Sequence, residues 1–382
     1  MKMLFASDSF KGSLTAVEIC DLLAAEAEKI FPGTQTVSVP IADGGEGTVE
    51  ALLRAMGGTW MTTTVTGPLF TPVDAKWGML SDGTTAVMEM AQASGLPYVT
   101  QAQRDPRNTT SYGTGEMIAD ALRRGAKTIL IGIGGSATND GGMGMLSALG
   151  AVFTDVQGET VSPVGGSLKQ VAHADFSALL PELQTCRITV LCDVTNPLLG
   201  PTGATYTYGP QKGATPEICA ELEDGMANYA KVVAQATGRN IDRFPGAGAA
   251  GGLGAAFGGV LDATLKSGID AVLETVDFDA KLDGVDLVVT GEGRIDGQSV
   301  RFGKVPVGVA RRCAAKNIPV LCIAGGIGDG AEGLFDLCES TIQTTVSGPM
   351  ALEQAMTNAR TLYADAANRL FRAVRIGMGI KR

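Results

Sequence analysis

The stretch "VDLVVTGEGRIDGQSVRFGKVPVGVARRCAAKNIPVLCIA", residues 285–324, decides the fold. It begins with an apolar segment of strand length and continues through a polar loop that contains glycine. A segment with helical spacing of its apolar residues follows, and a second apolar segment ends the stretch. Because strands joined by a helix run parallel in one sheet, this part of the chain predicts a parallel sheet covered by helices.

The N-terminal part of the chain repeats this pattern twice, as strand, polar loop and helix, whereas the segment after residue 60 changes to short alternating strands with turn signals. We therefore predict an α/β protein of two domains. Residues 1–60 and 283–382 would form a Rossmann-like parallel-sheet domain, and residues 61–282 an inserted mixed α/β domain. The active site is expected in the cleft between them. A simple division near residue 160 is the alternative.

Composition narrows the function class. The formal net charge is −10 over 382 residues, so no basic field is available for nucleic acid. With one histidine, His173, and seven cysteines without a C-x-x-C pair, a histidine zinc site or a Ser-His-Asp triad is not expected. We find no signal peptide and no spanning segment, and we therefore expect a cytoplasmic enzyme without a membrane partner. A homo-oligomer stays open.

Three loops that combine acids with glycine follow predicted strands of the two-ended domain. Their candidate residues are Asp8, Lys11, Asp43, Glu46, Glu292, Arg294 and Asp296. A lysine or arginine there suits an anionic ligand, and a carboxylate suits Mg²⁺ or a hydroxyl proton. The alternatives are a solvated lysine, acids that cap a helix, and a local ion-pair network.

Two further loops lie in the middle of the chain. The first, "LIGIGGSATNDGGMG", residues 130–144, is either an elaborate turn or a cradle whose backbone N–H groups hold an anion. The second places an acid at a strand end and returns a lysine to it, as phosphoryl-transfer sites do, and a structural turn is the alternative. The candidate residues are Gly134, Gly135, Ser136, Thr138, Asn139, Asp140, Asp193, Asn196 and Lys212.

Nucleotide motifs of other classes are weak or missing. "GAGAAGG", residues 246–252, matches G-x-G-x-x-G, but the segment before it is a poor strand, and a tightly packed helix is the better interpretation. No Walker motif occurs. The residues alone therefore indicate phosphoryl transfer from a nucleotide to a small polar acceptor.

The ordered set "DSFKGSL", "ADGGEGT", "GIGGSATNDGG", "CDVTNPLLG", "GPQKGA", "GAGAAGGLGA" and "TGEGRID" resembles the bacterial type 1 glycerate kinases over nearly the whole chain. The resemblance implies phosphorylation of D-glycerate by ATP with Mg²⁺, most commonly to 2-phospho-D-glycerate, in glyoxylate or sugar-acid catabolism. It also implies two α/β domains with a cleft between them.

Roles follow from the resemblance as hypotheses. Asp193 is the first choice to orient the glycerate hydroxyl, Arg294 or a lysine would hold its carboxylate, and Glu292 or Asp296 would hold Mg²⁺. Asp8 and Lys11 complete the catalytic set, and the other candidates would bind substrate or nucleotide. Two departures stand out. Ser7 replaces an expected proline, which predicts a looser turn, and a longer segment before Lys304 leaves that lysine outside the set.

Two alternatives come from other functional classes. A nicotinamide-dependent hydroxy-acid dehydrogenase would explain "GAGAAGG" and the α/β ends of the chain. A non-catalytic sugar-acid sensor would keep the pocket without turnover, although the candidate loops retain their acids and lysines.

Overall fold

The computed structural model describes residues 1–380, and its contacts divide the chain into two units. Unit 1 comprises Met1–Asp43, Glu50–Gly57 and the chain from Ile269 onward, and unit 2 comprises Gly44–Val49 and Gly58–Gly268. The sequence predicted the second domain boundary between residues 282 and 283, but residues 269–282 belong to unit 1 in the structure. There, Arg312 pairs with Asp270 and Asp279 at N–O distances of 3.7 and 2.7 Å.

Unit 1 contains a sheet of five parallel strands in the order β13-β12-β11-β1-β2. The strands are β1 (Lys2–Phe5), β2 (Gln35–Ser38), β11 (Leu287–Ile295), β12 (Val320–Ile327) and β13 (Ser340–Thr344). From β1 the chain continues to β2 on one side, whereas β11 to β13 extend the sheet on the other. The switch point, where such sheets bind ligands, therefore lies between β1 and β11.

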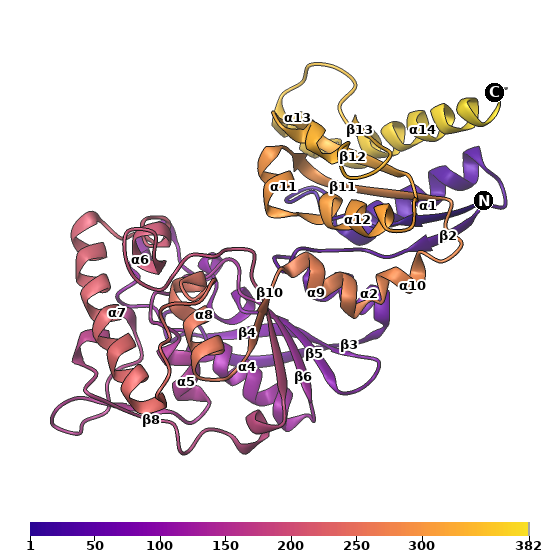
Figure 1. The fold of residues 1–382 in the computed structure, drawn as a ribbon. Helices are drawn as coiled ribbons and strands as arrows, with labels where there is room; N and C mark the ends of the chain where they lie inside the picture. Colours follow the sequence, from indigo (N-terminus) through magenta and orange to yellow (C-terminus); the bar gives the residue numbers. More distant parts are fainter. Residues whose placement is uncertain (381–382) are drawn as a thin grey trace. The chain divides into compact units, whose positions relative to one another are not determined.

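Helices cover both faces of this sheet (Figure 1). They are α1 (Ala16–Ile30), α9 (Gly268–Thr275), α10 (Phe278–Lys281), α11 (Gly297–Phe302), α12 (Val305–Ala314), α13 (Leu352–Thr357) and α14 (Ala359–Met378), while α2 (Thr48–Met56) spans both units. Ile323 of β12 packs with α1 and α14 on one face, and its neighbours Cys322 and Ala324 pack with α12 on the other. This alternation is the period-two pattern of a strand buried on both faces.

Unit 2 contains a six-stranded mixed sheet in the order β10-β9-β6-β5-β4-β3. The strands are β3 (Gly58–Thr66), β4 (Pro72–Leu80), β5 (Thr85–Glu89), β6 (Thr128–Gly132), β9 (Arg187–Leu191) and β10 (Thr264–Lys266), and a separate ladder joins β7 (Val152–Thr154) to β8 (His173–Asp175). Strands β3, β4 and β5 pair antiparallel and the others parallel. The alternating pattern after residue 60 predicted this change of pairing.

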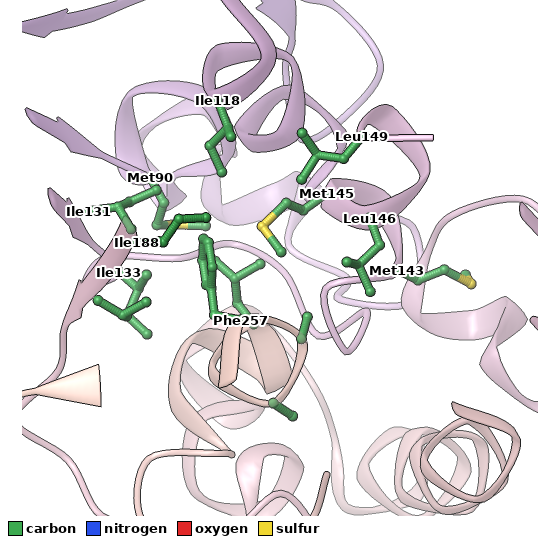
Figure 2. Packing of buried hydrophobic residues seen from close by; sticks show 14 of the residues in the cluster. Met90, Ile118, Ile131, Ile133, Met143, Met145, Leu146, Leu149, Ile188 and Phe257 are labelled. Atoms are coloured by element: carbon green, nitrogen blue, oxygen red, sulfur yellow. The ribbon is translucent and has the colours of Figure 1, made fainter. Parts of the chain in front are cut away.

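Helices of unit 2 enclose a large apolar core. They are α3 (Ala91–Ser94), α4 (Tyr112–Arg123), α5 (Met143–Ala148), α6 (Ala204–Tyr208), α7 (Pro216–Thr237) and α8 (Ala249–Gly259). Short 3₁₀ segments are η1 (Leu96–Tyr98), η2 (Gln101–Gln103), η3 (Gly165–Gln170), η4 (Pro181–Gln184) and η5 (Pro210–Lys212), with η6 (Ala331–Leu334) in unit 1. Figure 2 shows Phe257 of α8 directed toward Met145 and Ile188 in this core.

The predicted fold class is confirmed: a parallel sheet built from both ends of the chain accompanies an inserted unit with a mixed sheet. The segment "GAGAAGG" leads into a buried helix, as expected. The C-terminal helical segment is divided at Asn358 into α13 and α14. Within residues 1–380, no helix combines the length and the apolar character needed to cross a membrane.

Candidate functional site

A pocket of about 380 Å³ lies at the carboxyl edge of the unit 1 sheet. Each of the five strands contributes to its lining, through Asp8 after β1, Asp43 after β2, Glu292 in β11, Gly325 in β12 and Thr345 after β13. The carboxyl ends of parallel strands meet at one edge, and this explains why residues so distant in sequence come together. The volume lies in the range of small-molecule sites.

Asp8 is held at the switch point. Its backbone N–H donates to Gly291 O at 2.9 Å, and its Oδ1 accepts from Ser9 N at 2.7 Å. Burial raises the pKa of Asp8 to about 7, and the nearby charge of Asp43 raises it further than the Ser9 N–H lowers it. The expected loosening by Ser7 is offset, because its hydroxyl donates to Gly291 O at 3.0 Å and so ties the turn to β11.

Glu292 is the second buried acid of the pocket, with 4% of its surface exposed. Burial raises the pKa of its carboxyl to about 7, although a hydrogen bond from Ser299 and the charge of Lys304 lower it. Its Oε2 lies 3.9 Å from Lys304 Nζ, whereas its Oε1 is buried without a hydrogen-bond partner. Buried polar atoms are normally satisfied, so Oε1 marks a place where a bound group would complete the bonding.

Lys304, which the sequence left outside the candidate set, lines the same pocket. It is the residue immediately before α12, where the positive end of the helix dipole disfavours a cation. The carboxylate of Glu292 offsets that repulsion. A lysine directly before the helix-starting pair Val305-Pro306 was the sequence signal for this role.

Two more cations of the candidate set line the pocket. Lys11 lies on the turn after β1, in which Gly12 adopts a φ of +77° and Phe10 N donates to Leu14 O at 2.8 Å. Arg294 has a side chain that is 71% exposed, and its Nε lies 3.2 Å from Asp296 Oδ2. Both cations are therefore available to an anionic ligand.

Asp296 has a different task. It is the N-cap of α11, and its Oδ1 accepts from Gln298 N at 3.0 Å and Ser299 N at 3.2 Å. These hydrogen bonds, the one from Ser299 N–H first, lower the pKa of Asp296, and Arg294 adds to the effect. Asp296 is not among the residues that line the pocket. Across residues 1–380, no three His, Cys, Asp or Glu side chains form a metal-binding cluster.

The acids of "IADGGEGT" separate between the units. Asp43 belongs to unit 1 and lines the pocket, and Glu46 is an exposed residue of unit 2. Capping of α2 falls to Glu89 of β5, whose Oε1 accepts from Val49 N at 3.1 Å. Burial raises the pKa of Glu89, and the backbone N–H groups at the helix start lower it.

In the loop after β6, only the glycine pair is open. Gly134 and Gly135 are exposed, whereas Ser136, Thr138, Asn139 and Asp140 are buried. The small residues serve close packing of protein against protein. An added Cβ on Gly251 of α8 would lie 2.0 Å from Thr138 O, and Gly141 N donates to Gly251 O at 3.0 Å.

Asp140 braces this loop against two helices. Its Oδ2 accepts from Ser111 N at 2.8 Å, Ser111 Oγ at 2.7 Å and Gly144 N at 3.2 Å, and its Oδ1 accepts from Gly142 N at 3.1 Å. Burial nevertheless raises its pKa, against the effect of these donors. A carboxylate with four internal donors holds structure together.

Lys212 holds the same loop from the other side. Its Nζ donates to Ser136 Oγ at 2.8 Å and to Thr138 O at 2.6 Å, and the residue is 2% exposed. Burial lowers the pKa of Lys212 to about 7, and the charge of Asp140 opposes the shift. The loop therefore rests on a buried lysine and a buried carboxyl.

The remaining predicted residues stabilise the loop after β9. Asp193 is exposed, and its Oδ1 accepts from Gly268 N at 2.9 Å. Asn196 Nδ2 donates to Thr202 O at 2.8 Å, and its Oδ1 accepts from Tyr208 OH at 2.7 Å. The structure thus gathers Asp8, Lys11, Asp43, Glu292 and Arg294 in the unit 1 pocket, with the other candidates outside its lining.

Comparison with known sequences decides the family. The sequence model of the Glycerate kinase family matches residues 3–375. The chain belongs to the glycerate kinase family. Among curated relatives, the glycerate 2-kinase of Escherichia coli is 45% identical over 99% of each chain, and the glycerate kinase of Bacillus subtilis is 44% identical over 98% of each.

Solved structures agree with this family membership. A crystal structure assigned as glycerate kinase 2 from Salmonella typhimurium LT2 matches with a TM-score of 0.91 and 42% identity, and 100% of each chain is covered. The chain is accordingly an enzyme of the kinase class, and a kinase uses a nucleotide substrate. Membership in the glycerate kinase family sets aside the dehydrogenase and sensor alternatives.

Proposed function

We propose that the enzyme transfers the γ-phosphoryl group of ATP to a hydroxyl of D-glycerate and forms 2-phospho-D-glycerate, within glyoxylate or sugar-acid catabolism. The observation that carries this proposal is the unit 1 pocket, where buried carboxylates face cations at the switch point of a parallel sheet. The 2-phosphate is supported by the E. coli relative, which is named a glycerate 2-kinase.

Asp8 is our choice for the residue that accepts the proton of the glycerate hydroxyl. It lines the pocket and is fixed by Gly291 and Ser9, so its carboxylate is presented in one position. Asp193 was the first choice for this role from the sequence. Its carboxylate accepts a hydrogen bond from Gly268 N–H, and we propose that it stabilises that turn instead. Phosphoryl transfer needs such a positioned base together with cations around the transferred group.

Lys11, Arg294 and Lys304 supply those cations. Their charges converge on the pocket that holds the two buried acids, and they would bind the anionic groups of glycerate and ATP. The exposed Arg294 fits a carboxylate with two parallel hydrogen bonds. This arrangement orients the substrates before transfer.

Glu292 fits Mg²⁺ because its Oε1 is buried in the pocket wall without a partner. When bound, Mg²⁺ neutralises charge on the phosphates of the nucleotide. No cluster of three ligating side chains occurs in residues 1–380, so the protein would supply one or two carboxylates, with Asp43 as the second. Magnesium sites of nucleotide enzymes commonly take their other ligands from phosphate and water.

The residues of unit 2 divide into two groups in this proposal. The exposed Gly134, Gly135 and Glu46 are open to substrate or nucleotide. Ser136, Thr138, Asn139, Asp140, Asn196 and Lys212 hold the loops that carry the open positions. Backbone N–H groups of an exposed glycine pair suit an anionic group.

A coupled assay tests the reaction and its product. The enzyme is incubated with ATP, Mg²⁺ and D-glycerate, and enolase is then added alone. We expect direct formation of phosphoenolpyruvate, because enolase acts on the 2-phosphate. If phosphoenolpyruvate forms only when phosphoglycerate mutase is also added, the product is the 3-phosphate and the assignment of the 2-phosphate is wrong. If no ADP forms, the proposed function is wrong.

A further inference from the structure

One wall of the unit 1 pocket is apolar. Leu352, Ala355 and Met356 of α13 and Ala359 of α14 line it, opposite in character to the acids and cations of the strand ends. Leu352 is 75% exposed and Met356 is 39% exposed, and none of the residues of α13 is buried. Exposed apolar side chains that rim a charged pocket indicate a surface that a ligand covers.

The apolar wall begins directly beside the cation turn. An added Cβ on Gly12 would lie 3.0 Å from Met356 Cε, so Met356 rests on the turn that carries Lys11. Beneath it, Phe10 is 6% exposed and meets the Tyr363 ring edge-on, with centroids 5.4 Å apart. The base of this wall is therefore well packed, and only the α13 side chains remain uncovered.

We propose that this wall receives the purine base of the nucleotide, with the phosphates extending from it toward Lys11 and Lys304. The inference rests on the proposed function, because it takes ATP as the donor. Of the two substrates, glycerate is a three-carbon acid with a carboxylate and two hydroxyls, and it has no apolar face to bury. The base is the one part of either substrate that matches Leu352 and Met356.

The charge pattern agrees with this orientation. Lys11, Lys304 and Arg294 line the pocket together with the apolar wall, so one ligand can contact both. A nucleoside triphosphate has the same division, an apolar ring at one end and a chain of anionic groups at the other. Contact with the ring covers Leu352 and Met356, which otherwise expose apolar surface to water.

The test measures binding directly by titration calorimetry. The double variant Leu352→Ala with Met356→Ala is compared with the unchanged enzyme for three probes: ATP, inorganic tripolyphosphate and D-glycerate. We expect the Kd for ATP to rise about tenfold, since contacts to two side chains are lost, and the other two Kd values to stay within about twofold. Ile376→Ala, a change at an exposed apolar residue of α14 outside the pocket lining, is the matched control.

Several results would overturn the inference. They are an unchanged Kd for ATP in the double variant, an equal loss for tripolyphosphate, a loss confined to glycerate, and no binding of ATP by the unchanged enzyme. Failure of the proposed function is distinguishable. If the unchanged enzyme binds ATP but makes no phosphoglycerate, the proposed function fails, and the Kd values alone decide whether the wall holds the base.

Discussion

The pocket of unit 1 and the buried loop of unit 2 both hold groups whose pKa values lie near 7, but in opposite surroundings. Asp8 and Glu292 line an open pocket, where burial and neighbouring acids raise their pKa values to about 7. Lys212 is enclosed by its own loop, and burial lowers its pKa to about 7. In the first region the carboxyls with raised pKa values line a pocket that is open to a ligand. In the second region the lysine with the lowered pKa donates its hydrogen bonds to the protein itself.

The comparison shows that a shifted pKa indicates function only where the group can be reached. It also predicts pH dependences of opposite sign. A carboxyl whose folded pKa exceeds its unfolded value binds a proton preferentially in the folded state, so its contribution to stability falls as pH rises between those values. A lysine whose folded pKa is below its unfolded value contributes a rise in stability with pH.

The largest effect is expected from substitutions that test which aspartate accepts the proton of the glycerate hydroxyl. Asp8→Asn removes the proposed proton acceptor of the pocket, and we expect kcat to fall by about 100-fold or more. Asp193→Asn alters the carboxylate that accepts a hydrogen bond from Gly268 N–H, and it should lower kcat by less than about tenfold. Steady-state rates with glycerate, together with circular dichroism spectra, check the pair. The reverse order of effects would move the base to unit 2.

A second change tests whether Lys212 acts only inside its unit. Its pKa is about 7 in the folded protein and near 10.5 in the unfolded chain, so between these values only the unfolded chain holds the proton. We therefore expect the unfolding free energy of the unchanged protein, relative to Lys212→Met, to rise by about 2 kcal/mol between pH 7 and 8.5. Urea unfolding at both pH values measures it.

Cysteines with raised pKa values also make the unfolding free energy depend on pH. Because both proteins contain these cysteines, their contribution cancels in the difference between the unchanged protein and Lys212→Met. A constant difference between the two proteins would mean that Lys212 stays charged inside the fold. Lys212 would then be a permanent cation inside unit 2, and the contrast between the shifted pKa values of the two regions would disappear.

A third change tests Glu292 as the magnesium carboxylate. Glu292→Gln keeps the size of the side chain and removes its charge, and we expect about a tenfold higher Mg²⁺ concentration for half-maximal rate. Glu353→Gln alters an exposed acid of α13 outside the pocket lining and should leave that concentration unchanged. Initial rates over a magnesium series decide between them, and equal behaviour of the two variants would remove Glu292 from the metal.

The smallest effect is expected at Asp296. Asp296→Ala deletes the N-cap of α11 and should lower the unfolding free energy by about 1 kcal/mol, and Asp296→Ser should restore most of it. Urea unfolding measures the loss. A raised magnesium requirement in the serine variant, which still caps the helix, would show instead that Asp296 takes part in the site.

The sequence predicted the fold class because its signals are local. Apolar strands and polar loops are each recognised within a few residues, and the capping box that Thr15 and Glu18 form at the start of α1 is equally local. The gathering of Asp8, Asp43 and Glu292 also followed from parallel strands ending at one edge.

The sequence could not separate pocket residues from residues that brace loops. Asp140 and Asp296 looked like ligands because each stands among glycines. Asp140 is held by Ser111, which lies 29 residues away and which only the folded chain brings near. Asp296 is held by the nearby Gln298 N–H, a local capping bond that the sequence did not separate from ligand binding. Lys212 required knowledge of Ser136 and Thr138 across 70 or more residues of chain. Lys304 was left out because the segment before it is longer than the family pattern, and the sequence did not show that Glu292, on another element, lies 3.9 Å from it.

The cation at the start of α12 also bears on how this enzyme can evolve. Lys304 stands where a helix favours serine, threonine or aspartate, so replacing it would strengthen α12. A laboratory selection that rewarded heat resistance alone would therefore tend to discard this lysine. If Lys304 binds the anionic substrates as proposed, its presence in the natural chain is a compromise, in which selection for turnover outweighs selection for a more durable helix.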